Sequence, residues 1–554
     1  MIKTNNLISQ FNKTKEYIDN ANPKLISIWV FVLLLIVSLF SYPQYYLNGD
    51  MAEYLNNAIR IVNGDKPYVN FWLLFTPGEV YFPALIYKIF GKNINNVIIF
   101  TTIFSCLNSF VIFGLSKKLN FSNSISIFST FLFFYTSVIF NYIGPCYINL
   151  YLTFSLIAIY FLFSFYETNN NRKLLYSGLS IGIASYFRLY EVGAIAISIL
   201  ISFLIFLVIN KFSKKEILKN IITFIIGILS IMVMYSTIHY QIFPKMFTEV
   251  VFESVKNGTS MNLPYLYGIN DYIHQSSLAY ENIEGFSTIP FLINKILGLT
   301  KICLYFFLPI LGLPILLYFI YKIKSNTEIF ITSLTLLIWS YISFAKGLGR
   351  TDLSHLAPAL APLLMLFVYI FTQIPKSNSK VFSKTFRKTV SFVLIVSLVL
   401  FLYPIQGIFK QIYSKNCNVI FYNQVIRCRD KSTTEDTQRL VNLIYKNTNE
   451  YDYIFVTNWG APPLYAISNR LNPTYFDSMN DLIVRPSLEK ESRIINSLEK
   501  TKTKLIIHGH WGYDGKANQQ IQTTCKLLES YIIENYRLID VFGEYQIYKR
   551  KTLF

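Results

Sequence analysis

The sequence predicts a polytopic α-helical membrane protein that ends in a small external α/β domain, and three observations support this prediction. Of the 554 residues, 53% are hydrophobic, only 15% are charged, and the mean hydropathy is +0.39. Soluble domains contain fewer apolar and more charged residues. Apolar runs of about 20 residues, long enough to cross ~30 Å of hydrocarbon, recur up to residue 408. From residue 409 the charge rises and the apolar runs shorten to strand length.

Each of the long apolar runs is expected to form a membrane helix, which gives about eleven crossings. The runs are 25–42, 94–116, 122–141, 147–166, 172–188, 191–210, 217–238, 302–321, 327–345, 353–373 and 389–408. The first run follows a long polar segment and has no small-x-small cleavage site after it, so we do not interpret it as a cleavable signal peptide.

The positions of lysine and arginine predict the orientation in the membrane. Alternate connections carry the basic residues: Lys3 to Lys24, Lys117 and Lys118, Arg172 and Lys173, Lys211 to Lys219, Lys322 and Lys324, and the run from Lys376 to Lys388. Because basic loops remain in the cytoplasm, the N-terminus is expected on the cytoplasmic side of the cell (inner) membrane. The loops 43–93 and 239–295 are then expected on the outer side. The net charge of +19 is therefore interpreted as a topology signal and not as a sign of nucleic-acid binding.

Two domains are predicted, a membrane domain over 1–408 and an external, periplasmic domain over 409–554. In the second, short β-rich segments alternate with helical ones, as expected for an α/β domain. The predicted strands are 453–457, 504–509 and the closing "GEYQIYKR" at 543–550, and the predicted helices are 435–446, 488–500 and 518–535. Cys417 and Cys428 lie at the start of this domain. The sequence is compatible with a disulfide between them and with two free thiols.

The stretch after the first apolar run, "YYLNGDMAEYLNNAIRIVNGDKPYVNFWLLFTPGEVYFPALIYKIFG", is too long and too patterned for a plain connector. Asp50 is a predicted N-cap, Glu53 follows three residues later, and Gly64 is a predicted left-handed stop. The intervening helix is amphipathic and is expected to lie in the interface plane with its polar face in water. Asp50 has two readings: a cap alone, or a general base whose carboxylate stands at the edge of a cavity.

The order "GD…E…A…I..G..PY..FW….PG..Y….L.Y..FG" resembles the first external loop of the GT-C glycosyltransferases, in particular the protein mannosyltransferase and lipid A aminoarabinose transferase group (family 39/83-like). The resemblance implies a catalytic aspartate in this loop, here Asp50. It also implies transfer of a sugar from a polyprenyl-phosphate carrier to an acceptor outside the cytoplasm. Many relatives have an acid directly after the aspartate, whereas this chain has Met51 there and its acid at Glu53, so Glu53 is kept as a second catalytic candidate.

Four cationic residues are candidates for binding the donor phosphate. "GLSIGIASYFRLYEVGA" places Arg188 near Glu191 between two apolar runs, either as an ion pair that anchors a tight turn or as a phosphate ligand. "SFAKGLGRTDLSHLAP" contains Lys346, Arg350 and His355, with Asp352 between them. Cations there would stabilise the charge that develops on a leaving polyprenyl phosphate, or would anchor the loop in the interface.

No metal or other cofactor is expected, because no tight ligand motif accompanies the five histidines; His508 and His510 share one face of a predicted strand near Asp514. The predicted partners are the membrane, a polyprenyl-phosphate-linked sugar, and a lipid, glycan or protein acceptor. Two alternatives to this hexosyl- or pentosyltransferase remain: a flippase or transporter of lipid-linked glycans, and an O-antigen-type polymerase or ligase. The first does not explain the two long outer loops and the external α/β tail, and the second does not call for an aspartate directly after the first helix.

Overall fold

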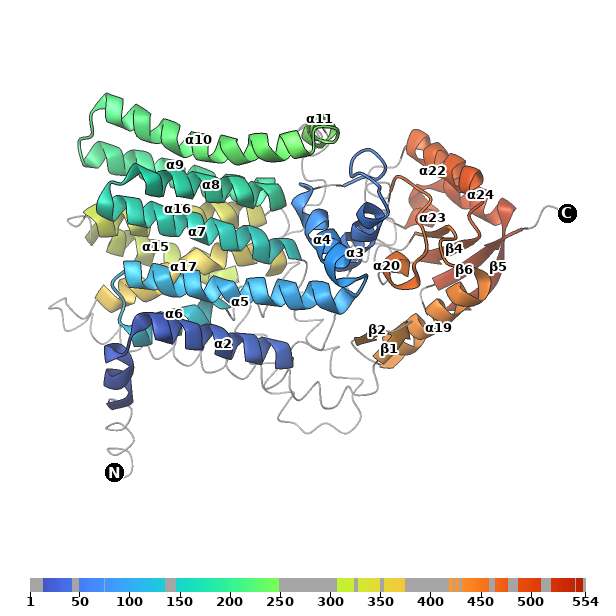
Figure 1. Ribbon diagram of the computed structural model, residues 1–554, viewed down its shortest axis with the longest axis horizontal. Coiled ribbons are helices and arrows are strands. Elements are labelled where there is room, and N and C mark those ends of the chain that lie inside the picture. The colour runs from blue at the N-terminus through green and yellow to red at the C-terminus, as the bar shows by residue number, and fades with distance from the viewer. Residues whose placement is uncertain are drawn as a thin grey trace, which may run out of the picture.

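The computed structural model describes residues 13–41, 49–73, 75–134, 146–248, 306–322, 327–348, 353–373, 418–421, 424–427, 431–457, 464–476, 487–509, 520–543 and 545–551. They form a helical bundle, a short helical layer at one end of it, and a domain with a β-sheet beyond that layer (Figure 1). The predicted helix at 389–408, most of the loop 239–295, and Cys417 and Cys428 lie outside the described residues.

Over the described residues, which omit 135–141 and 302–305, the bundle confirms the helical interpretation of the apolar runs as far as 353–373. Its helices are α2 (Pro23–Ser41), α5 (Ile94–Lys118), α6 (Asn123–Phe134), α7 (Cys146–Thr168), α8 (Asn171–Phe187), α9 (Leu189–Ile209), α10 (Lys214–Ile238), α15 (Leu308–Lys322), α16 (Thr327–Gly347) and α17 (Leu353–Gln373). Among the described residues, five helices are long and apolar enough to cross a membrane, or six if the bent pair Lys13–Asn20 and Pro23–Leu39 is one span. Eleven crossings therefore remain a prediction.

Close contact between α8 and α10 holds the outer side of the bundle together. A Cβ atom on Gly178 of α8 would meet the backbone oxygen of Phe224 in α10, and one on Gly227 of α10 would lie 2.6 Å from the backbone oxygen of Leu175. Small residues allow two membrane helices to approach until their backbones touch. The opposite side of α10 is apolar and exposed, as expected for a helix that faces lipid.

A helical layer of α3 (Gly49–Val62), α4 (Gly78–Phe90) and the short α11 (Phe243–Met246) lies between the bundle and the C-terminal domain (Figure 1). Gly64 has φ +100°, as predicted for the residue that ends α3. The N-cap prediction for Asp50 was wrong: α3 already includes Gly49, so the backbone of Asp50 belongs to its first turn, where an acid favours the helix dipole.

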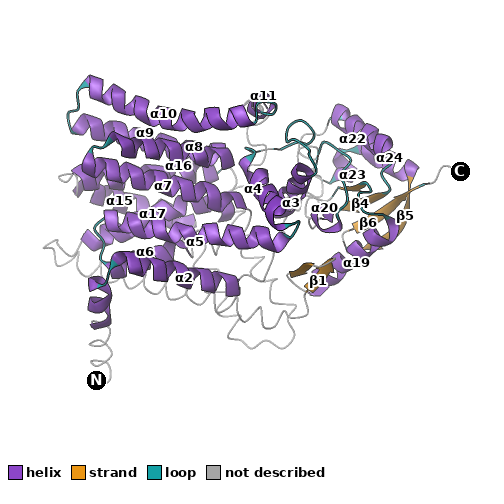
Figure 2. Cartoon of the chain, in the orientation of Figure 1, coloured by secondary structure: helices purple, strands orange, loops and turns teal. Residues whose placement is uncertain are grey.

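The C-terminal domain contains a four-stranded sheet in the order β3-β4-β6-β5, in which β3 and β4 are parallel and the other pairs antiparallel (Figure 2). β3 (Ile454–Val456), β4 (Leu505–Gly509) and β6 (Tyr545–Arg550) confirm the predicted strands. The edge strand β5 (Tyr536–Phe542) and the hairpin β1 (Asn418–Phe421) and β2 (Gln424–Arg427) were not predicted. β5 was not recognised in the sequence because only its first and last residues are buried, so its alternation of apolar and polar residues is weak.

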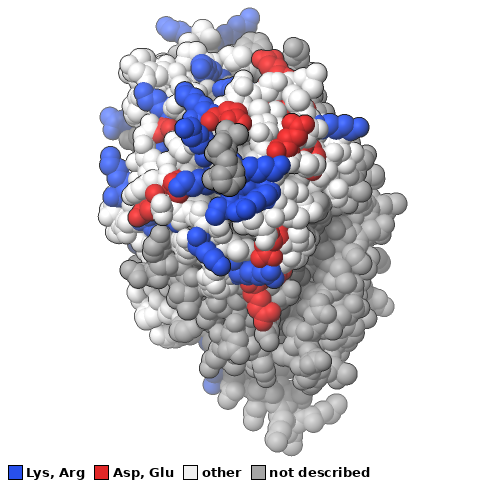
Figure 3. Space-filling model, turned by 90° about the vertical axis from the view of Figure 1, so that its right-hand side faces the viewer, with Lys and Arg blue, Asp and Glu red and all other residues white. Residues whose placement is uncertain are grey.

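Helices cover both faces of this sheet. α22 (Leu488–Thr501) and α24 (Lys526–Asn535) pack on one face together with Phe455 and Ile506, and α19 (Lys431–Asn447) packs on the other. The remaining short helices are α20 (Leu464–Ser468) and α23 (Ile521–Thr524). The face that points away from the bundle carries interspersed Lys, Arg, Asp and Glu side chains, as expected for a surface in water (Figure 3).

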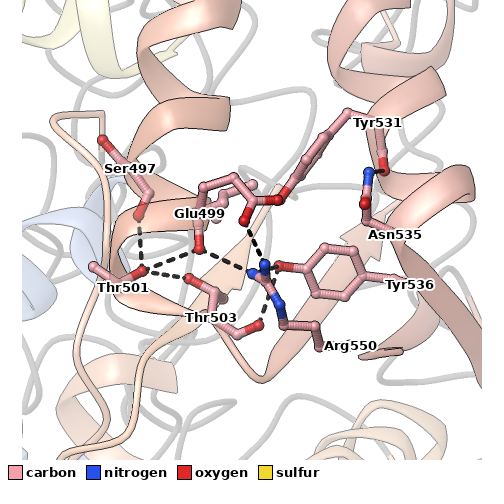
Figure 4. Close-up of polar contacts among 9 residues, drawn as sticks. Ser497, Glu499, Thr501, Thr503, Tyr531, Asn535, Tyr536 and Arg550 are labelled. Atoms are coloured by element: carbon pink, nitrogen blue, oxygen red, sulfur yellow. Dashed lines mark hydrogen bonds and ion pairs between the residues drawn. The ribbon is translucent and has the colours of Figure 1, made fainter. Parts of the chain in front are cut away.

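Polar contacts at the end of α22 tie this helix to the sheet (Figure 4). Glu499 accepts a hydrogen bond from the hydroxyl of Tyr531 at 2.5 Å and forms an ion pair with Arg550 of β6 at 2.5 Å. Tyr536 donates to the carbonyl oxygen of Thr503 at 3.1 Å. Because α22, α24, β5 and β6 all contribute, the network closes one end of the domain.

The C-terminal domain docks on the helical layer through residues 464–476. The backbone N–H of Ala466 donates to Oδ1 of Asn56 at 3.1 Å, and Arg60 donates from Nη1 to the carbonyl oxygen of Thr474 at 2.7 Å. The N–H of Trp72 donates to the carbonyl oxygen of Tyr475 at 2.6 Å. Asn56 is buried at this contact and Asn57 is buried as well, so the prediction that the polar face of the α3 helix lies in water was wrong for these two residues.

Candidate active site

One face of α3 carries the predicted base. Positions 50, 53, 54 and 57 lie on one side of the helix because they are three, four and seven residues apart. The side chain of Asp50 is outside the described residues, and Glu53 is partly buried. Asn57 is fully buried, and neither its amide nitrogen nor its oxygen has a hydrogen-bond partner in the part of the chain that the structure describes. A buried amide without partners costs about 1–3 kcal/mol, so a bound polar group on this face would be stabilised by it.

Arg188 lies at the break between α8 and α9, where its extended backbone interrupts the two helices. Its side chain is buried and forms an ion pair with Glu79 of α4. Nη2 donates to the hydroxyl of Tyr54 on α3 at 3.1 Å, and the guanidinium lies 3.5 Å from the centre of the Phe75 ring. Arg188 thus joins the bundle to the α3 face that includes position 50.

Glu79 is completely buried, and this burial raises the pKa of its carboxyl while the guanidinium of Arg188 opposes the rise. The ion pair that the structure gives Arg188 is with Glu79, whereas sequence analysis offered Glu191 as its partner; the charges of Arg188 and Glu191 still interact. Sequence analysis missed Glu79, although an acid within the apolar segment "TPGEVYFPAL" is a signal that could have identified it.

Glu191 pairs instead with Lys346. Nζ of Lys346, in the last turn of α16, lies 2.6 Å from Oε1 of Glu191 in the first turn of α9. The two residues are 155 positions apart in the sequence. The contact therefore places the end of α16 beside the Arg188 break, as the two phosphate-binding candidates Arg188 and Lys346 require.

Arg350 and Asp352 lie outside the described residues, in the connection between α16 and α17. His355 is in the first turn of α17, and its side chain is not described. The site as described therefore joins α3, α4, the α8–α9 break and the end of α16.

Of the residues His508, His510 and Asp514, which sequence analysis placed near one another, the structure describes only His508. His508 of β4 is buried, with Nδ1 2.9 Å from the hydroxyl of Thr457 and Nε2 3.0 Å from a carboxylate oxygen of Glu529. His510 and Asp514 lie outside the described residues. Within the described residues, no group of three His, Cys, Asp or Glu side chains is arranged to hold a metal ion.

Residues 65–240, which include Glu79 and Arg188, match the family model described as dolichyl-phosphate-mannose-protein mannosyltransferase. The Archaeoglobus fulgidus oligosaccharyltransferase, solved with a tethered acceptor peptide containing the NVT sequon, has a TM-score of 0.51 at 13% identity over 95% of this chain and 74% of that chain. ArnT from Cupriavidus metallidurans, solved bound to undecaprenyl phosphate, has a TM-score of 0.50 at 10% identity over 95% of this chain and 97% of that chain.

The resemblance to the GT-C glycosyltransferases is confirmed. No curated protein matches the sequence. At these identities the two structures share the fold of the GT-C superfamily with this chain, and the apolar helices of the bundle fit its multi-pass membrane architecture.

Proposed function

We propose that this GT-C protein is an inverting glycosyltransferase that moves a hexosyl or pentosyl group from a polyprenyl-phosphate carrier to an acceptor on the extracytoplasmic side of the cell (inner) membrane. The observation that carries the proposal is the buried link from Arg188 through Tyr54 to the Asp50 face of α3. It connects a cation at a break between membrane helices with the helix of the proposed base. ArnT, of the same fold, was solved with a polyprenyl phosphate bound.

The two ends of the bundle support the proposed orientation. The basic α7–α8 and α9–α10 connections lie at the end away from α3, α4 and the C-terminal domain (Figure 1). Basic connections are retained in the cytoplasm. In the proposal, the helical layer and the C-terminal domain are therefore outside the cell membrane, where lipid-linked donors present their sugars.

In the proposed reaction, Asp50 takes the proton from an acceptor hydroxyl as its oxygen attacks the anomeric carbon. The bond from this carbon to the phosphate oxygen breaks, and polyprenyl phosphate leaves with both bonding electrons. Cations that contact the phosphate stabilise this developing charge. Glu53 lies on the same helical face and assists by orienting the acceptor or by sharing the role of base.

The ion pairs suggest that the four proposed phosphate-binding residues differ in how strongly they bind the donor phosphate. Arg188 is neutralised by Glu79 and Lys346 is held by Glu191, so both carry less free positive charge towards a phosphate. Arg350 and His355 are therefore proposed as the main phosphate contacts. Arg188 and Lys346 then position the helices around the donor and add a weaker field.

The test is Asp50→Asn, assayed in membranes with a panel of labelled polyprenyl-phosphate sugars. We expect the transfer rate to fall by roughly 10²–10⁴-fold with unchanged protein level. Asp540→Asn, which removes a carboxylate from the outer edge of the C-terminal sheet, is the matched control and should keep the wild-type rate. A flippase, or a polymerase with another active site, would tolerate Asp50→Asn, and full activity of that variant would refute the proposal.

A further inference from the structure

A cavity of about 230 Å³ lies where the C-terminal domain meets the helical layer. Its walls come from three distant parts of the chain: Tyr68 and Val69 after α3, Lys245 and Thr248 at α11, and Tyr475 and Arg493 of the C-terminal domain. Pockets for drug-sized ligands begin at about 300 Å³, so this cavity suits a smaller molecule or one unit of a chain.

Two cations line this cavity, and none of the described residues that line it is acidic. Lys245 and Arg493 form no ion pair with any described residue, and no acid is among the lining residues. The guanidinium of Arg493 lies 3.9 Å from the centre of the Tyr475 ring, which fixes its plane at the cavity wall. Like charges brought together from two domains repel each other, so an anion between them would stabilise both the site and the docking.

The other lining groups favour a ligand with hydroxyl groups. Thr248 donates its hydroxyl to the carbonyl oxygen of Pro244 at 2.9 Å, so its oxygen remains an acceptor for a ligand hydroxyl. The rings of Tyr68 and Tyr475 provide flat apolar surface of the kind on which sugar rings pack. A simple inorganic anion would contact only the two cations, whereas an acidic sugar could contact the cations, the Thr248 hydroxyl and the tyrosine rings.

The backbone at the cavity is held in a conformation that the sequence alone does not favour. Tyr68 has φ +61°, which is an outlier for a bulky residue. Its N–H donates to the carbonyl oxygen of Phe71 at 2.6 Å, and its carbonyl oxygen accepts from the hydroxyl of Tyr475 at 3.1 Å. Strain of this kind persists where surrounding contacts impose it, and it is concentrated at ligand sites.

From these observations we infer that the junction cavity is a binding site for one acidic monosaccharide unit, free or glycosidically linked. The carboxylate or phosphate of the sugar bridges Lys245 and Arg493, and its hydroxyls contact Thr248. α3 has 14 residues, which makes it roughly 21 Å long. Asp50 is at its start and Tyr68 lies beyond its end, but Tyr68 is linked to the Arg188 site, because its hydroxyl donates to the carbonyl oxygen of Phe75, whose ring packs on the Arg188 guanidinium. None of the residues that line the cavity is a proposed catalytic residue, so binding there can be tested without the transfer reaction.

The test measures binding of methyl β-D-glucuronide to the purified full-length chain by calorimetry. Methyl β-D-glucoside serves as the uncharged analogue and acetate as the anion without hydroxyls. We expect the glucuronide to bind at least about tenfold more tightly than either, and more weakly at high salt. Lys245→Gln with Arg493→Gln should weaken glucuronide binding at least tenfold, whereas the control Arg537→Gln, an exposed residue of β5, should not.

Asp50→Asn separates this inference from the proposed function, because it should abolish transfer and leave glucuronide binding unchanged. Equal binding of the glucoside or of acetate would overturn the inference. So would full glucuronide affinity in the double variant, or the absence of binding to the wild type. Because both substituted side chains are exposed, the double variant is expected to fold, and its unfolding temperature verifies this.

Discussion

Arg188, at the break between α8 and α9, forms its ion pair with Glu79 of α4, and both side chains are buried. Glu79→Gln removes the ion-pair partner of a buried guanidinium, and breaking a buried pair costs about 3–5 kcal/mol. We expect a clear fall in the thermal unfolding midpoint, measured by fluorescence-detected size exclusion. Glu167→Gln, which removes the partner of Lys118 at the other end of the bundle, is the control and should have a small effect. Equal midpoints for the two variants would contradict the importance given to the Arg188 pair.

The contact between α8 and α10 predicts a position-specific effect of alanine. In Gly178→Ala the new methyl group meets the backbone of α10, and overpacking of this kind costs about 1–3 kcal/mol. Gly193→Ala in α9 has open space around the new Cβ and should be neutral or stabilising. The comparison uses unfolding midpoints of both variants in the same detergent. A stabilised Gly178→Ala would show that the helices do not touch there.

The contacts of Arg60 suggest that directional hydrogen bonds hold the C-terminal domain on the helical layer. Its guanidinium contacts Oδ2 of Asp65 at 2.8 Å and the carbonyl oxygens of Asn70 and Thr474 at 2.9 and 2.7 Å. A lysine keeps the charge but lacks the planar fork, so Arg60→Lys should be only partly better than Arg60→Ala. We expect faster hydrogen exchange over 464–476 in both variants, and unchanged exchange in α22. Wild-type exchange rates over 464–476 in Arg60→Ala would exclude this role.

The α16–α17 connection predicts graded losses of transfer. If Arg350 and His355 contact the donor phosphate, then Arg350→Ala and His355→Ala should lower kcat/KM by about 10–10³-fold, less than Asp50→Asn. Lys346→Gln should have the mildest effect, because Glu191 already neutralises this lysine. Rates are measured with the polyprenyl-phosphate donor that the wild type accepts. Unchanged rates for Arg350→Ala and His355→Ala would remove both residues from the site.

The Glu499 network predicts a pH dependence in the C-terminal domain. The hydrogen bond from Tyr531, aided by Arg550, holds the pKa of the Glu499 carboxyl below its ordinary value of 4.5. A lowered pKa means that the stabilisation is complete above pH 4.5 and is lost as the pH falls below it. Since Glu499 is half exposed, the contribution is below about 1 kcal/mol. The protection of the β6 amides, corrected for the intrinsic exchange rate at each pH, should fall on acidification in the wild type and less so in Glu499→Gln.

Features that depend on local sequence patterns were predicted, whereas features that depend on long-range packing were not. The apolar runs, the strands β3, β4 and β6, and the left-handed Gly64 follow from local patterns and were predicted. The partners of Arg188 and Lys346 were not, because an ion pair between helices leaves no mark in local spacing. The burial of Asn56 was missed for the same reason, since its partner Ala466 is 410 residues away.

That separation also sets an order of events during synthesis. At roughly 5–20 residues per second, α3 leaves the ribosome about 20–80 s before residues 464–476 exist to cover it. Throughout this interval Asn56 lacks its partner Ala466, so α3 reaches its final setting only after residues 464–476 have been synthesised. The final docking of α3 is therefore timed by translation of the C-terminal domain that covers it.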